Sequence, residues 1–243
     1  MADPREQPDY EQVIQEFIAW VKRSYCYEVI DPNPKYPVLN EFVAVDSIRQ
    51  YFEEESQRKL KKITRALFPN NQRVWPEDIL TGKIGIFCTL LNIHKGPWIE
   101  HFRHHDALSD SSLPFDPKRL PPDWPEDTGD PEFLQRFCEE QWKFCVPIMR
   151  SPFVDKRFQK NRVLPIVFRK TLNTGASAAL WQIKLHPSYN QLIPEAAKSV
   201  RASCQVLLRL DGRDVDSSRL ETRRRRRYIC PQNVLYCGRR NIL

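Results

Sequence analysis

The segment from Arg162 to Leu192, RVLPIVFRKTLNTGASAALWQIKLHPSYNQL, most strongly constrains what this chain can fold into. Apolar residues first alternate with their neighbours, Leu164, Ile166 and Phe168 against Pro165, Val167 and Arg169. Small residues follow over 173–178, and a second β-prone run then contains Leu180, Trp181 and Ile183. Two such runs around a short turn predict a β-hairpin. Small turn residues also let backbone N–H groups approach an anion closely.

The residues before this hairpin carry a helical pattern. Apolar side chains recur there at three- and four-residue spacing, which is typical of amphipathic helices. The predicted helices are Tyr10–Tyr27, Asp46–Phe68 with Asp46 as the cap, one starting at Pro76, Phe87–His94, Pro97–His104 and Pro131–Cys145. Prolines are plentiful, 20 in 243 residues, and we interpret the region Pro114–Pro165 as connector rather than core. The sequence therefore predicts an α+β protein with a mostly helical domain over residues 1–150 and a linker over residues 151–162.

Net charge is concentrated at one end of the chain. The whole sequence has a formal charge of +7, and residues 217–243 alone contain eight Arg and one Glu. The positive and negative charges of the preceding residues therefore cancel, so no basic face is spread over the fold. Only the run Arg223–Arg227 indicates binding to nucleic acid or a nuclear location. A solvated charged segment is the more common interpretation of such a run. Nucleic acid is therefore not an expected partner.

Nothing in the sequence indicates secretion or a membrane. The N-terminal MADPREQPDY lacks the basic and apolar regions of a signal peptide. The most apolar run, Ile84–Ile93, is too short to span a bilayer. Seven irregularly spaced cysteines fit reduced thiols better than a disulfide framework. We expect an intracellular, cytoplasmic protein without membrane association, with the nucleus as the alternative.

Metal and common hydrolase sites lack support. The candidate ligands match no paired zinc-ligand spacing, so buried or polar structural roles are the better interpretation. These candidates are Cys88, His94, His101, His104 and His105. Neither HExxH, GxSxG nor GxxxxGK[ST] occurs in the sequence. The sequence therefore predicts no metal site.

The turn of the hairpin resembles the glycine-rich loop that opens a protein kinase domain. In that family an aliphatic residue precedes the first glycine, and an aliphatic residue followed by an aromatic one ends the motif. Leu172, Leu180 and Trp181 fit those places, and Gly175 stands at the middle glycine. Asn173 and Ala178 replace the first and third glycines. The resemblance implies that nucleotide contacts come from Leu172, Asn173, Gly175, Ser177, Ala178 and Leu180.

The residues after the hairpin extend this resemblance. The kinase pattern continues with a lysine in an apolar strand, and Cys204–Leu210 takes that place, with Leu208 or Arg209 at the lysine position. A helix with a pairing glutamate follows in the family, which Glu221 matches, and Cys230–Val234 lies where the next turn and strand belong. The resemblance implies that residues 163–243 form a partial kinase-like small lobe, an antiparallel sheet plus one helix.

Three earlier stretches resemble the helical segment that precedes the kinase domain in a group of filamentous-fungal proteins. They are Phe87–Phe115, Glu140–Met149 and Val163–Ile166. Together with the hairpin they cover about half of the chain. The resemblance supplies no function for the helical segment itself.

Kinase chemistry needs more than this sequence contains. A kinase requires a lysine on the phosphates, an aspartate for the substrate hydroxyl and an Asp/Asn pair for Mg²⁺. Neither H-R-D nor D-F-G occurs in these residues. We therefore expect a truncated kinase-like protein without catalytic residues, without phosphotransfer and with at most weak nucleotide binding. ATP and Mg²⁺ would be cofactors only of a longer form. The alternatives are an interaction module whose helical domain binds a protein partner, and a shortened version of an active kinase.

Overall fold

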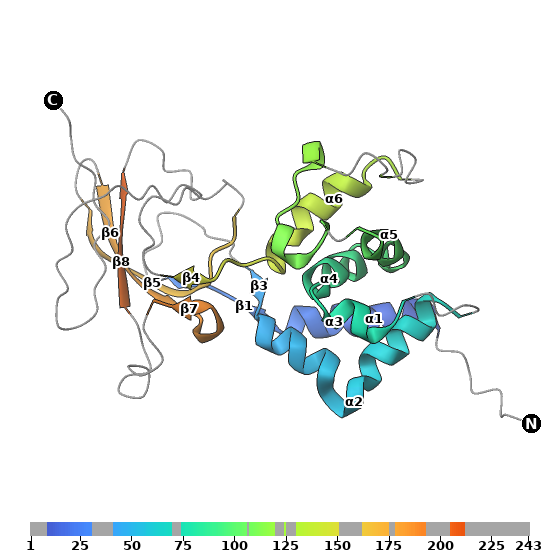
Figure 1. The fold of residues 1–243 in the computed structure, drawn as a ribbon. Coiled ribbons are helices and arrows are strands. Elements are labelled where there is room, and N and C mark those ends of the chain that lie inside the picture. Colours follow the sequence, from blue (N-terminus) through green and yellow to red (C-terminus); the bar gives the residue numbers. More distant parts are fainter. Residues whose placement is uncertain are drawn as a thin grey trace, which may run out of the picture. The chain divides into compact units, whose positions relative to one another are not determined.

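The computed structural model describes residues 9–30, 41–69, 74–105, 107–119, 124, 130–150, 162–174, 178–192 and 205–211. The chain divides into two compact units (Figure 1). The helical unit comprises Met1–Tyr25 and Val43–Cys145, and the strand unit comprises Cys26–Phe42 and Val146–Leu243. The segment Cys26–Phe42, which the sequence pattern assigned to the helical region, thus groups with the strand unit. The mixture of helices and sheets agrees with the predicted α+β class.

The helical unit contains each of the predicted helices, with shifted ends. Its α-helices are α1 Tyr10–Arg23, α2 Val45–Leu67, α3 Pro76–Leu80, α4 Ile84–Asn92, α5 Ile99–Arg103 and α6 Phe133–Glu140. Its 3-10 turns are η1 Gly96–Trp98, η2 Asp110–Ser112, η3 Pro117–Arg119 and η4 Gln141–Lys143. Helix α1 begins as expected, because the Asp9 side chain caps it by accepting from the Glu11 backbone N–H. It ends at Arg23, before the predicted Tyr27, because Tyr25–Cys26 forms strand β1.

Helix α2 differs from its prediction in two ways. Its N-cap is Ala44 rather than Asp46, which lies inside the first turn, where a negative charge favours the helix dipole. The helix is also broken in the middle, since Glu55, Ser56 and Gln57 have φ values of 50°, 55° and 66°. Such a left-handed turn is rare for residues other than glycine. It redirects the chain, so that residues on both halves of α2 are buried, among them Ile48, Phe52, Leu60 and Ile63.

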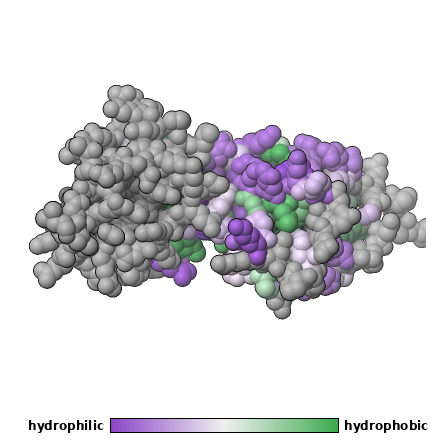
Figure 2. Space-filling view, turned by 90° about the horizontal axis from the view of Figure 1, so that it is seen from above, coloured by the Kyte–Doolittle hydropathy of each residue, from purple (hydrophilic) through white to green (hydrophobic). Residues whose placement is uncertain are grey.

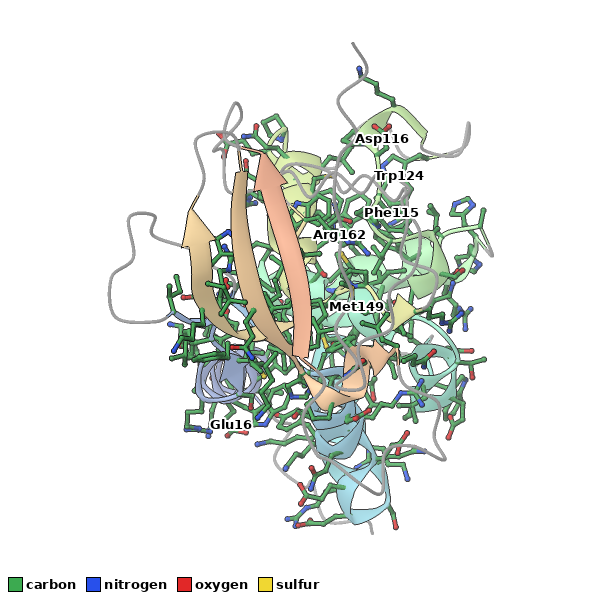
Figure 3. All side chains as sticks on the ribbon, turned by 90° about the vertical axis from the view of Figure 1, so that its left-hand side faces the viewer. Glu16, Phe115, Asp116, Trp124, Met149 and Arg162 are labelled. Atoms are coloured by element: carbon green, nitrogen blue, oxygen red, sulfur yellow. The ribbon has the colours of Figure 1, made fainter. Side chains whose placement is uncertain are left out.

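The core of the helical unit is rich in aromatic rings. The Phe102 ring lies 5.7 Å from Phe115, 5.1 Å from Trp124 and 5.5 Å from Phe137, measured between centroids. Figure 3 shows the labelled Phe115 and Trp124 near one another. The expectation that residues 114–165 are connector rather than core is therefore wrong for this part. Aromatic side chains in a proline-rich segment can fill a core as well as those on a helix.

A buried glutamine fixes the segment that carries Phe115. Gln141 is 1% exposed, and its Oε1 accepts from the Phe115 backbone N–H at 2.7 Å. Its Nε2 donates to the carbonyls of Phe115 and Cys138 at 3.2 and 3.1 Å. One side chain thus satisfies a backbone donor and two acceptors, which stabilises a segment outside the helices.

The strand unit contains a four-stranded sheet in the order β2-β5-β6-β8. Strands β5 and β6, and β6 and β8, are antiparallel, whereas β2 runs parallel to β5. Two further pairs, β1 with β3 and parallel β4 with β7, complete the described sheets. The bounds are β1 Tyr25–Cys26, β2 Val29–Ile30, β3 Phe42–Val43, β4 Met149–Arg150, β5 Ile166–Thr174, β6 Ala178–Leu185, β7 Asn190–Gln191 and β8 Gln205–Asp211.

The outside of the helical unit is mainly polar. In Figure 2 its coloured surface is mostly hydrophilic, with a smaller hydrophobic area between the polar regions. Among the residues that the structure describes, no helix has both the length and the apolar character needed to cross a bilayer.

Candidate functional site

The predicted hairpin is present in the strand unit, formed by β5 and β6. Cα partners run from Ile166 with Leu185 to Thr174 with Ala179. Strand β8 lies on the other side of β6, so three strands lie side by side (Figures 1 and 3). Strands that follow one another in the sequence usually pair with one another. A third antiparallel strand beside the hairpin is therefore the expected arrangement.

A bulge sets which residues of β5 face inward. The register shifts between Ile166, which pairs with Leu185, and Phe168, which pairs with Lys184. Because a bulge adds one residue to a strand, the side chains after it exchange faces. The uninterrupted alternation in the sequence would have placed Phe168 beside Ile166 and turned Arg169 outward. Instead, Ile166 is 1% exposed, Phe168 is only half-buried, and the Arg169 side chain is 11% exposed.

The sheet therefore has two different faces. We call the buried one the inner face, made by Ile166, Arg169, Trp181, Ile183 and Leu185. We call the other the outer face, made by Val29, Phe168, Lys170, Gln182 and Lys184. The inner face carries mainly apolar groups, whereas both lysines of the outer face are exposed.

The inner face also holds a buried charged pair that the sequence pattern did not reveal. Arg169 Nε lies 2.5 Å from Glu28 Oε1, and the Glu28 side chain is fully buried. The guanidinium carbon also lies 5.1 Å from the centre of the Trp181 ring, within cation–π range. Pairing offsets the desolvation of both charges. Glu28 reaches this place because β2 pairs with β5, and local sequence patterns do not signal a contact between segments so far apart in the chain.

The β6–β8 register separates the two candidates for the kinase lysine position. Arg209 is the Cα partner of Leu180, and Leu208 is the partner of Trp181. Directly opposite positions of an antiparallel pair belong to the same face of a sheet. Leu208 therefore occupies an inner-face position with Trp181, whereas Arg209 shares the outer-face row with Leu180. The two candidates thus stand on opposite faces of the sheet.

The other predicted site residues are placed in part. Leu172 lies near the end of β5 and is 46% exposed. Asn173 pairs with Leu180, and Ala178 begins β6 as the partner of Asp211. The remaining residues lie outside the part of the chain that the structure describes, namely Gly175, Ser177, Glu221 and the run Arg223–Arg227. The described strands thus bring Leu172, Leu180 and Arg209 to one end of the sheet.

Burial affects ionisable side chains of the helical unit, among them those of Cys88, Cys138 and Asp110. Burial raises the pKa of the Cys88 thiol well above its ordinary value and that of Cys138 to about 11, so both favour the unreactive thiol form. Burial also raises the pKa of Asp110, although its carboxylate accepts backbone N–H groups of Gly85 and Ile86 at 3.1 Å. Those bonds fix the start of α4. Within the described residues, no three His, Cys, Asp or Glu side chains gather as metal ligands.

Comparison of the chain with protein-family models, with curated proteins and with solved structures finds no match. Chemically, the end of the sheet near the β5–β6 connection offers apolar positions at Leu172 and Leu180 beside a cationic residue, Arg209. Apolar residue types next to a cationic one are a composition that suits a ligand with a flat ring and an anionic group.

Proposed function

We propose that the strand unit is a degenerate kinase-like small lobe that binds a nucleoside triphosphate weakly and does not transfer phosphate as this chain stands. The β6–β8 register is the observation that supports it. Arg209 stands directly opposite Leu180, on the strand that pairs with the second strand of the hairpin. In protein kinases the glycine-rich loop covers the phosphates and the lysine lies on the third strand, and Arg209 lies on the strand that follows the hairpin here.

Each group then has a chemical role. Leu172 and Leu180 would contact the base, because both lie at the ends of the strands that flank the small-residue turn. Backbone N–H groups of the turn 173–178 would approach the phosphates, which small side chains permit. Arg209 would supply the positive charge. A guanidinium is planar and bulkier than an ammonium group, so it would hold the phosphates in a different geometry from the usual lysine.

Two considerations make the proposed binding weak and non-catalytic. One sheet provides only one wall of a nucleotide site, so the base stays partly solvated. The 243 residues also contain neither H-R-D nor D-F-G, so they provide neither the usual base for the substrate hydroxyl nor the usual Mg²⁺ aspartate. Phosphotransfer therefore lacks its main groups in this chain.

Titration of the full chain with a fluorescent ATP analogue in the presence of Mg²⁺ tests the proposal. We expect a dissociation constant on the order of 1 mM, which corresponds to about −4 kcal/mol. Arg209→Ala should abolish measurable binding, and Arg209→Lys should retain it. Lys22→Ala, which removes an exposed cation from α1, is the matched control and should leave binding unchanged.

The same preparations test the catalytic part. With labelled ATP and a generic protein substrate, we expect no phosphate incorporation above a blank without protein. Incorporation that scales with protein concentration would contradict the proposal, and so would nucleotide binding that survives Arg209→Ala. Equal loss of binding in Arg209→Ala and Lys22→Ala would show a non-specific charge effect instead.

A further inference from the structure

Helix α2 is bent by residues whose types do not favour a bend. Figure 1 shows its two arms at an angle, and we call residues 45–53 the first arm and residues 58–67 the second arm. Between them Glu55, Ser56 and Gln57 have left-handed backbones, which are unfavourable for residues with a Cβ. Residues 53–59 read EEESQRK, with neither glycine nor proline and with mostly strong helix formers. The local sequence therefore favours a continuous helix.

The polar groups at the bend also favour straightening. Among the described residues no donor reaches the side-chain oxygen of Gln57, although that atom is buried. A buried acceptor without a partner destabilises the form that buries it. In the bent form Lys59 pairs with Glu54, and Arg58 with Glu55. A continuous helix would pair the same four side chains at the i, i+4 spacing with each acidic residue first, so straightening loses no charge pair.

Contacts between the segments before and after the bend oppose straightening. The Phe52 ring of the first arm lies 6.0 Å from the Phe87 ring of α4, measured between centroids. Glu16 on α1 pairs with Lys62 on the second arm at 2.6 Å. In the strand unit, β2 before the bend pairs with β5 after it. An isolated chain that straightened α2 would break these contacts and expose apolar surface to water.

We propose that α2 is a hinge for domain swapping, in which two copies of this chain straighten α2 and exchange the residues before the bend, including α1 and β2. Each copy then packs its Phe52 on the partner copy's α4 and pairs its β2 with the partner copy's β5. Every contact that closes the bent chain forms again between the two copies, and the strained bend is removed. Only a second copy carries the same complementary surfaces. Short hinge segments under strain favour such an exchange.

Refolding of the full chain at high concentration provides the test. The exchange needs the core to open, because Ile48 and Phe52 of the first arm are 1% and 0% exposed. The chain is therefore refolded from urea at about 0.5 mM with a reducing agent. Light scattering after size-exclusion chromatography should show a dimer beside the monomer.

Cross-linking distinguishes an exchanged dimer from an ordinary one. Equal amounts of unlabelled and heavy-isotope-labelled chain are refolded together, and a carbodiimide then joins the Glu16 carboxylate to the Lys62 ammonium group, which lie 2.6 Å apart. In the exchanged dimer about half of these cross-links should join a light peptide to a heavy one, as measured by mass spectrometry. In the monomer each cross-link should join peptides of one isotope.

Substitutions at Ser56 should shift the dissociation constant of the dimer in opposite directions. Ser56→Gly relieves the bend and weakens the continuous helix, so it should raise the constant at least about tenfold. Ser56→Ala keeps the strain but favours the continuous helix, so it should lower the constant about fivefold. Arg49→Gly is the matched control and should leave the constant unchanged, because Arg49 lies in the right-handed first arm in both forms.

Three outcomes would overturn this inference. They are no dimer after refolding at up to about 1 mM, a dimer whose Glu16–Lys62 cross-links join only peptides of one isotope, and a dissociation constant that Ser56→Gly lowers or leaves unchanged. Ser56 is exposed, so both substitutions should keep the fold, and circular dichroism of the monomer fraction checks this. Nucleotide binding by the strand unit is a separate measurement, so failure of either proposal leaves the other standing.

Discussion

Replacing Ser56 by glycine should stabilise this protein, although glycine normally weakens a helix. Ser56 lies within the broken middle of α2 with φ 55° and ψ 43°. This left-handed conformation costs a residue with a Cβ roughly 1–2 kcal/mol of folding free energy. Glycine avoids that loss but adds about 0.5–1 kcal/mol of entropy to the unfolded chain. The net gain should be about 0.5–1 kcal/mol.

The site suits this measurement because the Ser56 side chain is exposed. Lys61 Nζ donates to the Ser56 backbone carbonyl at 2.9 Å, and the substitution keeps that carbonyl. Arg49→Gly is the matched control. Arg49 is exposed on the same helix but in the interior of its right-handed first half, where glycine costs about 1 kcal/mol.

Thermal unfolding followed by circular dichroism provides the assay. For a chain of this size 1 kcal/mol shifts Tm by roughly 2–4 °C. We expect Ser56→Gly to raise Tm by about 1–4 °C and Arg49→Gly to lower it by a similar amount. If both variants lower Tm equally, α2 is a continuous right-handed helix in solution and the reasoning is refuted.

Three other changes test the helical unit. Gln141→Leu should lower the free energy of unfolding by about 1–3 kcal/mol in urea titrations, because Phe115 loses its backbone partners. Gly96→Ala should cost about 1–3 kcal/mol, since the new Cβ would lie 2.7 Å from Leu67 Cδ2, and an unchanged midpoint would contradict this packing. The hydrogen bond from Lys95 lowers the pKa of Asp130, so its carboxylate stabilises the fold above the ordinary pKa of 3.8 and loses this effect as pH falls. Unfolding of Asp130→Asn should therefore depend less on pH below about pH 4 than unfolding of the natural chain.

Local patterns in the sequence were sufficient for most helices and for the hairpin. The spacing of Val13, Ile14, Phe17 and Val21 predicted α1, and these residues are buried. Periodic spacing is enough because each helix needs one apolar stripe regardless of its packing partner. The hairpin could be predicted for a related reason, because two β-prone runs around a short turn can pair with little loss of chain entropy.

Contacts between distant segments could not be predicted in this way. The sequence left Leu208 and Arg209 as equal candidates, and only the register with β6 shows that they stand on opposite faces of the sheet. The alternation around Phe168 was read without the bulge that turns Arg169 toward Glu28. Likewise, the strong helix formers in α2 gave no sign of the left-handed turn at Ser56.

The sequence by itself thus determined which segments become helices and which become the paired strands of the hairpin. The tertiary structure alone decided which side chains share a face, which strand lies beside β5 and where α2 breaks. The physical reason is that periodicity specifies a local conformation, whereas register and burial depend on surfaces supplied by segments far away in the chain.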